Sequence, residues 1–173
     1  MGMGKPVNMA LRALQFFWAL LVIALIGDMI SDATSGNPSI VNYAMFCAVF
    51  AMLSLLYLIP ATIKESLTIH PFLPLALDIL NTLFWFCGAV AMAAKLGVHS
   101  CSNNHYLKRN GITNGAENRS QRCHEAQATC AFLWFGFATF AASTVLSGLG
   151  SRGGANLGSS GIRRGPAPSM SHV

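Results

Sequence analysis

The sequence predicts an all-α integral membrane protein whose helices form a bundle of four spans. Hydrophobic residues make up 53% of the chain and charged residues only 10%, whereas roughly a quarter of the residues of soluble domains are charged. Four apolar stretches are long enough to cross a bilayer, and the eleven Lys and Arg residues lie almost entirely outside them. A chain of 173 residues has room for one such domain.

The four apolar stretches cover roughly residues 10–30, 40–59, 72–94 and 126–149. A helix rises 1.5 Å per residue, so each stretch spans about 30 Å, the thickness of the hydrocarbon core. We expect helices because backbone groups in lipid must be paired within the segment, and the stretches are too long and too uniformly apolar for barrel strands. The first stretch is not followed by a small-residue cleavage site, so we expect it to be retained rather than removed as a signal peptide.

Polar segments connect and follow the predicted helices. Residues 31–39 form a short turn that contains Gly36 and Pro38, and residues 97–125 form the one long loop. We place the membrane domain at residues 1–149. Residues 150–173 are rich in Gly, Ser and Pro, which is typical of a disordered tail, and this tail is basic through Arg152, Arg163 and Arg164.

Four spans place both termini on the same side of the membrane. Lys and Arg residues are slightly more numerous on the side of the termini, which is a weak indication that this side is cytoplasmic. Asn118 begins an Asn-Arg-Ser sequon in the long loop, which favours the opposite, extracytoplasmic side for that loop. The closeness of Asn118 to the fourth predicted helix argues against its actual glycosylation.

Two cysteines, Cys101 and Cys123, bracket the long loop. A disulfide between them would stabilise the protein by roughly 3 kcal/mol in the chain-entropy model. It would persist only on an oxidising side of the membrane, so we expect the loop outside and both termini in the cytoplasm. Two alternatives stay open: a zinc site made by both cysteines with His105 and His124, and unpaired thiols. We favour the disulfide, because adjacent residues such as Cys123 and His124 rarely direct both side chains at one metal.

Asp78 lies within the third predicted helix, about 10 Å from its start. An ionised carboxylate at that depth costs several kcal/mol unless it is paired or protonated. Asn81 shares its helix face, and the first helix presents Arg12 and Gln15 at a similar depth. Either Asp78 and Asn81 line a path in a small transporter or channel subunit, or Asp78 makes a structural contact to Arg12 or Gln15. We favour the contact, because the spans contain no deeper charges and no paired Gly and Pro breaks.

Other function classes find little support in the sequence. No cluster of His, Asp or Cys is dense enough for catalysis, so we expect no enzymatic activity, cofactor or metal. The net charge of +5 is not arranged as a basic stripe with exposed aromatics, so we expect no nucleic-acid partner. Thr139, Ser143 and Ser147 repeat small residues at four-residue spacing, which is typical of close helix packing within the bundle or in a homo-oligomer. We expect most aromatic side chains of the spans to face lipid.

Four segments together resemble the fungal non-classical export protein 2 family: VNYAMF at residues 41–46, LDILN at 77–81, SCSNN at 100–104 and RCHEAQA at 122–128. They occur in the family's order from the first helix to the tail. The resemblance implies a four-helix MARVEL domain in the plasma membrane, associated with the eisosome, a furrow-like compartment organised by BAR-domain proteins. It also implies roles in membrane organisation, sphingolipid sensing and leaderless protein export.

From these observations we expect a non-enzymatic organiser of the plasma membrane. Its expected partners are sphingolipid, sterol, anionic headgroups and a BAR-domain scaffold beneath the bilayer. An arginine near an anionic surface contributes about 1 kcal/mol, so Arg152, Arg163 and Arg164 would make a weak and reversible contact with headgroups or scaffold. The alternative function is the transporter or channel subunit that uses Asp78 and Asn81.

Overall fold

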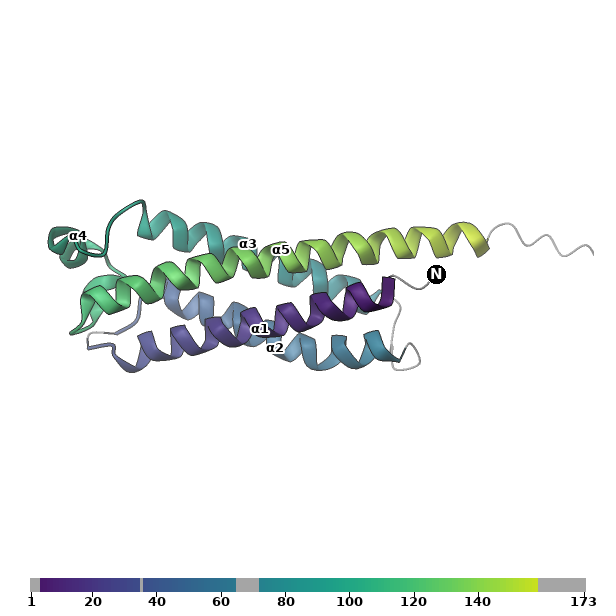
Figure 1. Cartoon of the computed structure of the whole chain (residues 1–173), viewed down its shortest axis with the longest axis horizontal. Coiled ribbons are helices and arrows are strands. Elements are labelled where there is room, and N and C mark those ends of the chain that lie inside the picture. The colour runs from purple at the N-terminus through teal and green to yellow at the C-terminus, as the bar shows by residue number, and fades with distance from the viewer. Residues whose placement is uncertain (1–3, 35, 65–71, 159–173) are drawn as a thin grey trace, which may run out of the picture.

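A computed structural model describes residues 4–34, 36–64 and 72–158 (Figure 1). Its long helices are α1 (Gly4–Ser31), α2 (Ser39–Ile63), α3 (Leu73–Leu96) and α5 (Arg119–Gly158). The short helix α4 (Asn104–Arg109) and the 3-10 turn η2 (Thr113–Gly115) lie between α3 and α5. Within the described ranges there is no strand, only an isolated bridge between Ala33 and Ala116. The all-α prediction is confirmed, and all four long helices are apolar and long enough to cross a membrane.

The helices are longer than the apolar stretches, and the difference is largest for α5. This helix begins at Arg119 instead of residue 126, because the side chain of Asn118 accepts a hydrogen bond from the backbone N–H of Gln121 (3.2 Å) and so caps the first turn. It ends at Gly158, so residues 150–158, which we expected to begin a disordered tail, continue the helix. Adding residues to an existing helix is far easier than starting one. Residues 159–173, with Arg163 and Arg164, lie outside the described residues.

The four long helices run up and down along one axis (Figure 1). Helices α1, α2, α3 and α5 pack in that order around a ring, and α5 closes the ring against α1, so α1 and α3 lie diagonally across the bundle. The start of α1 and the end of α5 lie at one end, and α4 lies at the other. We call residues 97–118 the cap, and we call the two ends of the bundle the capped end and the terminal end.

Small and apolar side chains fill the interior at spacings of three and four residues. The buried residues of α1 include Ala19, Val22, Ile26 and Met29, and those of α2 include Ala44, Cys47, Ala48 and Ala51. The alanines among these residues allow close approach of helices in lipid, where packing drives association. Two aromatic residues, Trp85 and Phe140, are also wholly buried, with ring centroids 5.7 Å apart. These two are exceptions to the expectation that most aromatic side chains face lipid, and Trp85 finds room beside the glycine at position 136 of α5.

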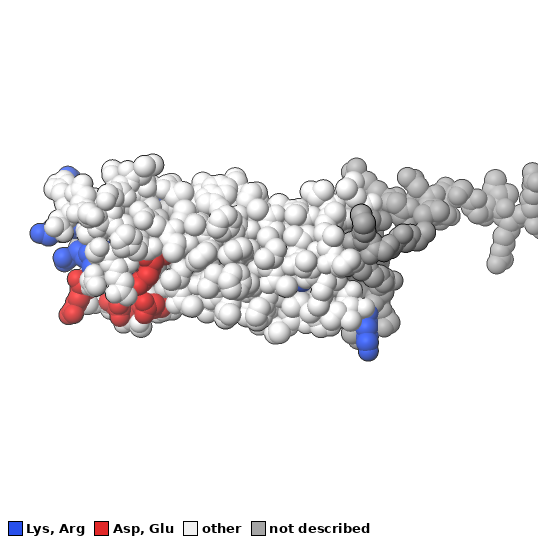
Figure 2. Space-filling view, viewed as in Figure 1, with Lys and Arg blue, Asp and Glu red and all other residues white. Residues whose placement is uncertain are grey.

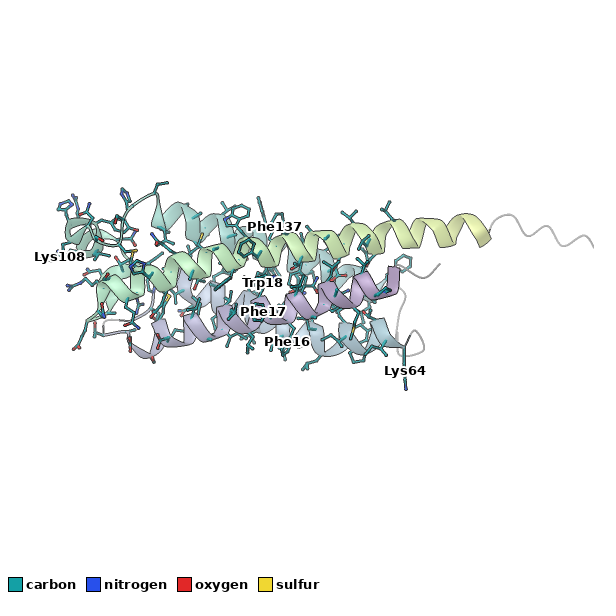
Figure 3. All side chains as sticks on the ribbon, viewed as in Figure 1. Phe16, Phe17, Trp18, Lys64, Lys108 and Phe137 are labelled. Carbon is teal, nitrogen blue, oxygen red and sulfur yellow. A yellow bond between two sulfur atoms is a disulfide. The ribbon has the colours of Figure 1, made fainter. Side chains whose placement is uncertain are left out.

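The outside of the bundle is apolar between its two ends. Among the described residues, Figure 2 shows Lys, Arg, Asp and Glu gathered at the capped end and basic atoms without acidic ones at the terminal end, where Figure 3 labels Lys64. Large apolar side chains on the helices are well exposed, for example Leu53 (62%) and Leu56 (71%) on α2. Soluble monomers rarely expose a contiguous apolar surface that runs along a whole helical bundle. The belt between the two charged ends therefore fits the hydrocarbon core of a bilayer.

Candidate functional site

A buried ion pair joins α1 to α3 inside the membrane-spanning part of the bundle. Arg12 donates from Nη1 to Oδ1 of Asp78 (2.5 Å) and from Nη2 to Oδ2 (2.8 Å). Arg12 is 2% exposed and Asp78 is not exposed at all. Because α1 and α3 lie diagonally in the ring, the long arginine side chain crosses the middle of the bundle. The pairing is bidentate, which is the strongest geometry for an arginine and a carboxylate.

Gln15 extends this pair to a third helix. Its Oε1 accepts from Nη1 of Arg12 (3.0 Å), and its Nε2 donates to the hydroxyl of Ser143 (2.7 Å) and to the carbonyl of Thr139 (3.1 Å) on α5. Gln15 and Ser143 are fully buried. The sequence-based interpretation of Asp78 as a contact to Arg12 or Gln15 thus matches the geometry through Arg12, with Gln15 bound to the same guanidinium.

Asn81 belongs to a neighbouring contact and not to the ion pair. Its Nδ2 donates to the hydroxyl of Ser54 on α2 (2.8 Å) and to the carbonyl of Leu77 (2.9 Å). The two contacts together engage all four long helices at one level of the bundle. In the described part of the chain, Oδ1 of Asn81 and Nε of Arg12 are buried without a hydrogen-bond partner.

The residues of this polar layer have no access to water, which limits the chemistry that they can carry out. A carboxylate that carries protons or ions must reach water at some stage, whereas both oxygens of Asp78 are bound by one guanidinium and the residue is fully buried. Unpaired, such a charge would be costly in lipid, and paired, it holds helices together. The arrangement is that of an interhelical clamp.

A disulfide joins Cys101 in the cap to Cys123 in the second turn of α5, with Cα atoms 5.7 Å apart. Both cysteines are buried. Because both sulfur atoms are used in the bond, they are not available to a zinc ion, and the exposed His105 and His124 are left without the partners that the zinc alternative required. The structure therefore contains the bond that the sequence favoured.

Arg122 holds the capped end together, a role that the sequence did not predict for it. It is 1% exposed, and its guanidinium donates to the carbonyls of Ile112 (2.7 Å) and Met29 (2.5 Å) and to Oδ1 of Asn37 (3.1 Å). One side chain thus binds the cap, the last turn of α1 and the turn between α1 and α2. A cation beside the last carbonyls of a helix is also favourable for the helix dipole.

The cap closes over the end of α3 through two further donors. The hydroxyl of Tyr106 donates to the carbonyl of Leu96 (2.6 Å), and Nδ2 of Asn110 donates to the carbonyl of Lys95 (2.7 Å). Burial raises the pKa of the Tyr106 hydroxyl above its ordinary value, so this hydroxyl keeps its proton to a higher pH than an exposed tyrosine does. The end of α1 is fixed in a similar way, because the backbone N–H of Thr34 donates to the carbonyl of Gly115 (2.9 Å).

The remaining predicted residues lie at the two ends of the protein. Asn118 is exposed, and its amide also lies 3.4 Å from Oε1 of Gln121 while its Oδ1 caps α5. Its glycosylation stays a prediction. Arg152 lies in the last turns of α5, but its side chain, like the whole of Arg163 and Arg164, lies outside what the structure describes.

A family model described as a membrane-associating domain, MARVEL, matches residues 5–146, the part of the chain that holds the four spans, the ion pair and the disulfide. The chain belongs to the MARVEL family. Among curated proteins, it is 36% identical to non-classical export protein 2 of Saccharomyces cerevisiae, over 79% of this chain and 77% of that protein.

Two other relatives extend the match within fungi. The chain is 34% identical to non-classical export protein 102 of Candida albicans, over 96% of this chain and 97% of that protein. It is 31% identical to a non-classical export protein 2 homolog of Schizosaccharomyces pombe, over 78% and 73%. The resemblance to the fungal non-classical export protein 2 family is confirmed, and the chain is a multi-pass MARVEL membrane protein. No solved structure matches it.

Proposed function

We propose that this MARVEL protein is a non-enzymatic organiser of plasma-membrane microdomains of the eisosome type. In this proposal it associates with sphingolipid and sterol, and its presence in such a domain supports non-classical protein export. The observation that carries the proposal is that the polar groups inside the bundle are closed off in one layer of mutual contacts, whereas the exterior between the two ends is apolar. The deepest charges, Arg12 and Asp78, pair with each other inside the bundle. Contact with lipid is therefore made by the outer surface.

The outer surface contains an apolar pocket that a lipid chain can enter. This pocket of about 360 Å³ lies between α3 and α5, and its lining includes Leu83, Phe86 and Phe137. Phe86 and Phe137 lie with ring centroids 5.2 Å apart, and Figure 3 labels Phe137 on α5 together with the aromatic run of α1. We propose that lipid chains pack in this pocket and against these rings, and that the fit favours ordered, sphingolipid-rich and sterol-rich membrane.

The proposed role in export rests on the names of the relatives, and the proposed scaffold contact rests on the basic tail. Three relatives carry non-classical export in their names, and we extend that role to this chain. We further propose that the tail, through Arg152, Arg163 and Arg164, contacts anionic headgroups or a BAR-domain scaffold on the cytoplasmic side. Three arginines at about 1 kcal/mol each give an attraction that is reversible.

Partition between lipid phases tests the organising role. The purified protein is labelled and reconstituted into giant vesicles that separate into a sphingolipid-rich and sterol-rich phase and an unsaturated phosphatidylcholine phase. We expect enrichment in the first phase for the wild-type protein. An even distribution, or enrichment in the unsaturated phase, would contradict the proposal.

The tail contact is tested separately in cells. The variant with Arg152, Arg163 and Arg164 all changed to Gln should lose part of its microdomain localisation and recruit less scaffold, whereas Lys108→Gln, a charge loss at the capped end, should change neither. Unchanged localisation and recruitment in the triple variant would remove the tail from the model.

The transporter alternative makes a different prediction for the same preparation. It requires protons or ions to pass Asp78 and Asn81, so sealed vesicles containing the wild-type protein would show a flux that Asp78→Asn abolishes. We expect no flux above that of protein-free vesicles, because both oxygens of Asp78 are bound.

A further inference from the structure

Two adjoining pockets form one cleft at the capped end, between the start of α2 and the cap. The larger pocket has a volume of about 410 Å³ and is lined by Pro38, Ser39, Ile40, Lys95, Asn110, Gly111 and Ile112. The smaller, of about 340 Å³, is lined by Gly36, Asn37, Pro38, Gly111, Asn114 and Gly115. Because both are lined by Pro38 and Gly111, we treat them as one site and call it the cap cleft.

The cap cleft lies at the level where a bilayer changes from hydrocarbon to headgroups. Ser39 is the first residue of the α2 span, and Lys95 is the last residue but one of the α3 span. The two spans are neighbours in the ring. A cleft at this depth is open to the headgroup region on one side and to the hydrocarbon core on the other. A lipid, which has a polar headgroup and apolar chains, matches both.

The charge in the cleft is positive. Lys95 is exposed, and its ammonium forms no ion pair within the part of the chain that the structure describes. No carboxylate is among the lining residues. Two of the acidic residues of the capped end, Asp32 and Glu117, line a different pocket.

The rest of the lining divides into polar and apolar parts. The hydroxyl of the exposed Ser39 and the amides of the smaller pocket can bind the hydroxyls or phosphate oxygens of a headgroup. Pro38, Ile40 and Ile112 provide apolar walls for the first carbons of the chains. A volume of a few hundred Å³ lies within the usual range for small-ligand sites.

Arg122 fixes the width of the cleft from behind. It donates to Oδ1 of Asn37 on one wall and to the carbonyl of Ile112 on the other (3.1 and 2.7 Å). The disulfide anchors the residue next to it, Cys123, to the cap. The walls are therefore held at a set distance before any lipid binds, and Arg122 is a positioning residue for the cleft.

We propose that the cap cleft binds the phosphate-bearing headgroup of an anionic lipid from the leaflet at the capped end. Lys95 pairs with the phosphate, Ser39 hydrogen-bonds to the headgroup, and Pro38, Ile40 and Ile112 contact the upper part of the chains. This inference rests on the proposed function, since it names one lipid class and a site through which a membrane organiser would select its surroundings.

Competition between two lipids tests the site. The protein is purified in detergent with equal amounts of phosphatidylinositol and phosphatidylcholine of identical chains, and bound lipid is counted by native mass spectrometry. We expect the wild-type protein to retain phosphatidylinositol preferentially. Lys95→Gln should reduce this preference roughly fivefold, the factor expected for one lysine near an anionic group. Lys108→Gln, an equal loss of charge on α4 outside the cleft, should leave it unchanged.

A second variant tests the cleft by filling it. A Cβ atom added at Gly111 meets no heavy atom within 4 Å, so we expect Gly111→Leu to be accommodated, and it should abolish the preference while Lys95 remains in place. Equal retention of the two lipids by the wild-type protein would overturn the proposal, and so would an unchanged preference in both Lys95→Gln and Gly111→Leu.

The outcome separates the cleft from the proposed function. A wild-type protein that shows no lipid preference but still enters the sphingolipid-rich phase of giant vesicles would refute the cleft and leave the organiser intact. A preference that depends on Lys95 in a protein that distributes evenly between the phases would support the cleft and refute the organiser.

Discussion

At the scale of single residues, the ion pair between Arg12 and Asp78 shows most directly how lipid differs from water as a solvent. On a water-exposed surface such a pair contributes little, because water solvates both charges well. Inside the bundle each charge would lose its hydration and gain nothing in return if it stood alone. The pair is therefore strongly interdependent, and each residue is stabilising only while the other is present.

We predict that Asp78→Asn destabilises the protein by about 3 kcal/mol, the cost typical of a buried charge that has lost its partner. The double variant Arg12→Met and Asp78→Leu should be more stable than Asp78→Asn, because no charge is left in the core. Unfolding in mixed micelles with increasing sodium dodecyl sulfate measures both effects.

Asp28→Asn provides the matched control, since Asp28 is an exposed carboxylate near the capped end of α1. This variant should unfold like the wild-type protein. If Asp78→Asn were as stable as Asp28→Asn, the ion pair would not be a clamp.

Single residues also show how far the sequence could be used to predict the site. Asp78 and Arg12 stand out because a charge within an apolar stretch is rare, and their similar depth suggested their pairing. Arg122 could not be recognised in the same way. It lies next to a polar loop, where arginines are usually solvated, and only the folded cap brings the carbonyls of Ile112 and Met29 to its guanidinium.

At the scale of elements, the contact between α3 and α5 depends on one large residue and one small one. The indole of Trp85 packs directly against the backbone of Gly136, and a Cβ atom at Gly136 would overlap its ring. A hydrogen bond between the hydroxyls of Thr82 and Thr144 (3.1 Å) joins the same two helices nearer the terminal end. Close contact at a glycine is a common way for helices to associate in lipid.

We predict that Gly136→Ala destabilises the protein by about 1–3 kcal/mol, the usual cost of overpacking a core. The reason is that Trp85 is fully buried and cannot move aside without displacing its neighbours. The midpoint of thermal unfolding in lipid nanodiscs measures the change.

Gly88→Ala on α3 is the control for the loss of a glycine. The added Cβ would lie 3.5 Å from Sγ of Cys47 and further from other atoms, which is ordinary contact, so stability should be unchanged or slightly higher, as expected for alanine in a helix. Equal effects of the two substitutions would show that Trp85 does not pack as described.

The elements themselves divide into those that hydropathy predicts and those that it does not. Every one of the four spans was evident from its apolar stretch, since the length of a span is set by the bilayer. The first turns of α5 and the short helix α4 were not evident, because their polar residues have no apolar run to mark them. They depend on side-chain caps at Asn118 and Asn103, whose effect is local and is easily mistaken for that of a loop.

At the scale of the whole molecule, the protein is a bundle with two unlike ends. The capped end is fixed by a disulfide and by the guanidinium of Arg122, and it carries the cap cleft. The terminal end carries the start of α1, the end of α5 and Lys64 (Figures 1 and 3). Between them lies the apolar belt, so a membrane around that belt separates the two ends completely.

The most direct test of this account is therefore to label the two ends from one side of a membrane. A membrane-impermeant amine reagent is added to sealed vesicles of known orientation, and the labelled lysines are identified by mass spectrometry before and after the vesicles are opened. We predict that Lys108 and Lys64 are never labelled from the same side. In vesicles whose oxidising side faces outward, Lys108 reacts while they are sealed, and Lys64 reacts only once they are opened. Labelling of both lysines in sealed vesicles would contradict four membrane-spanning helices.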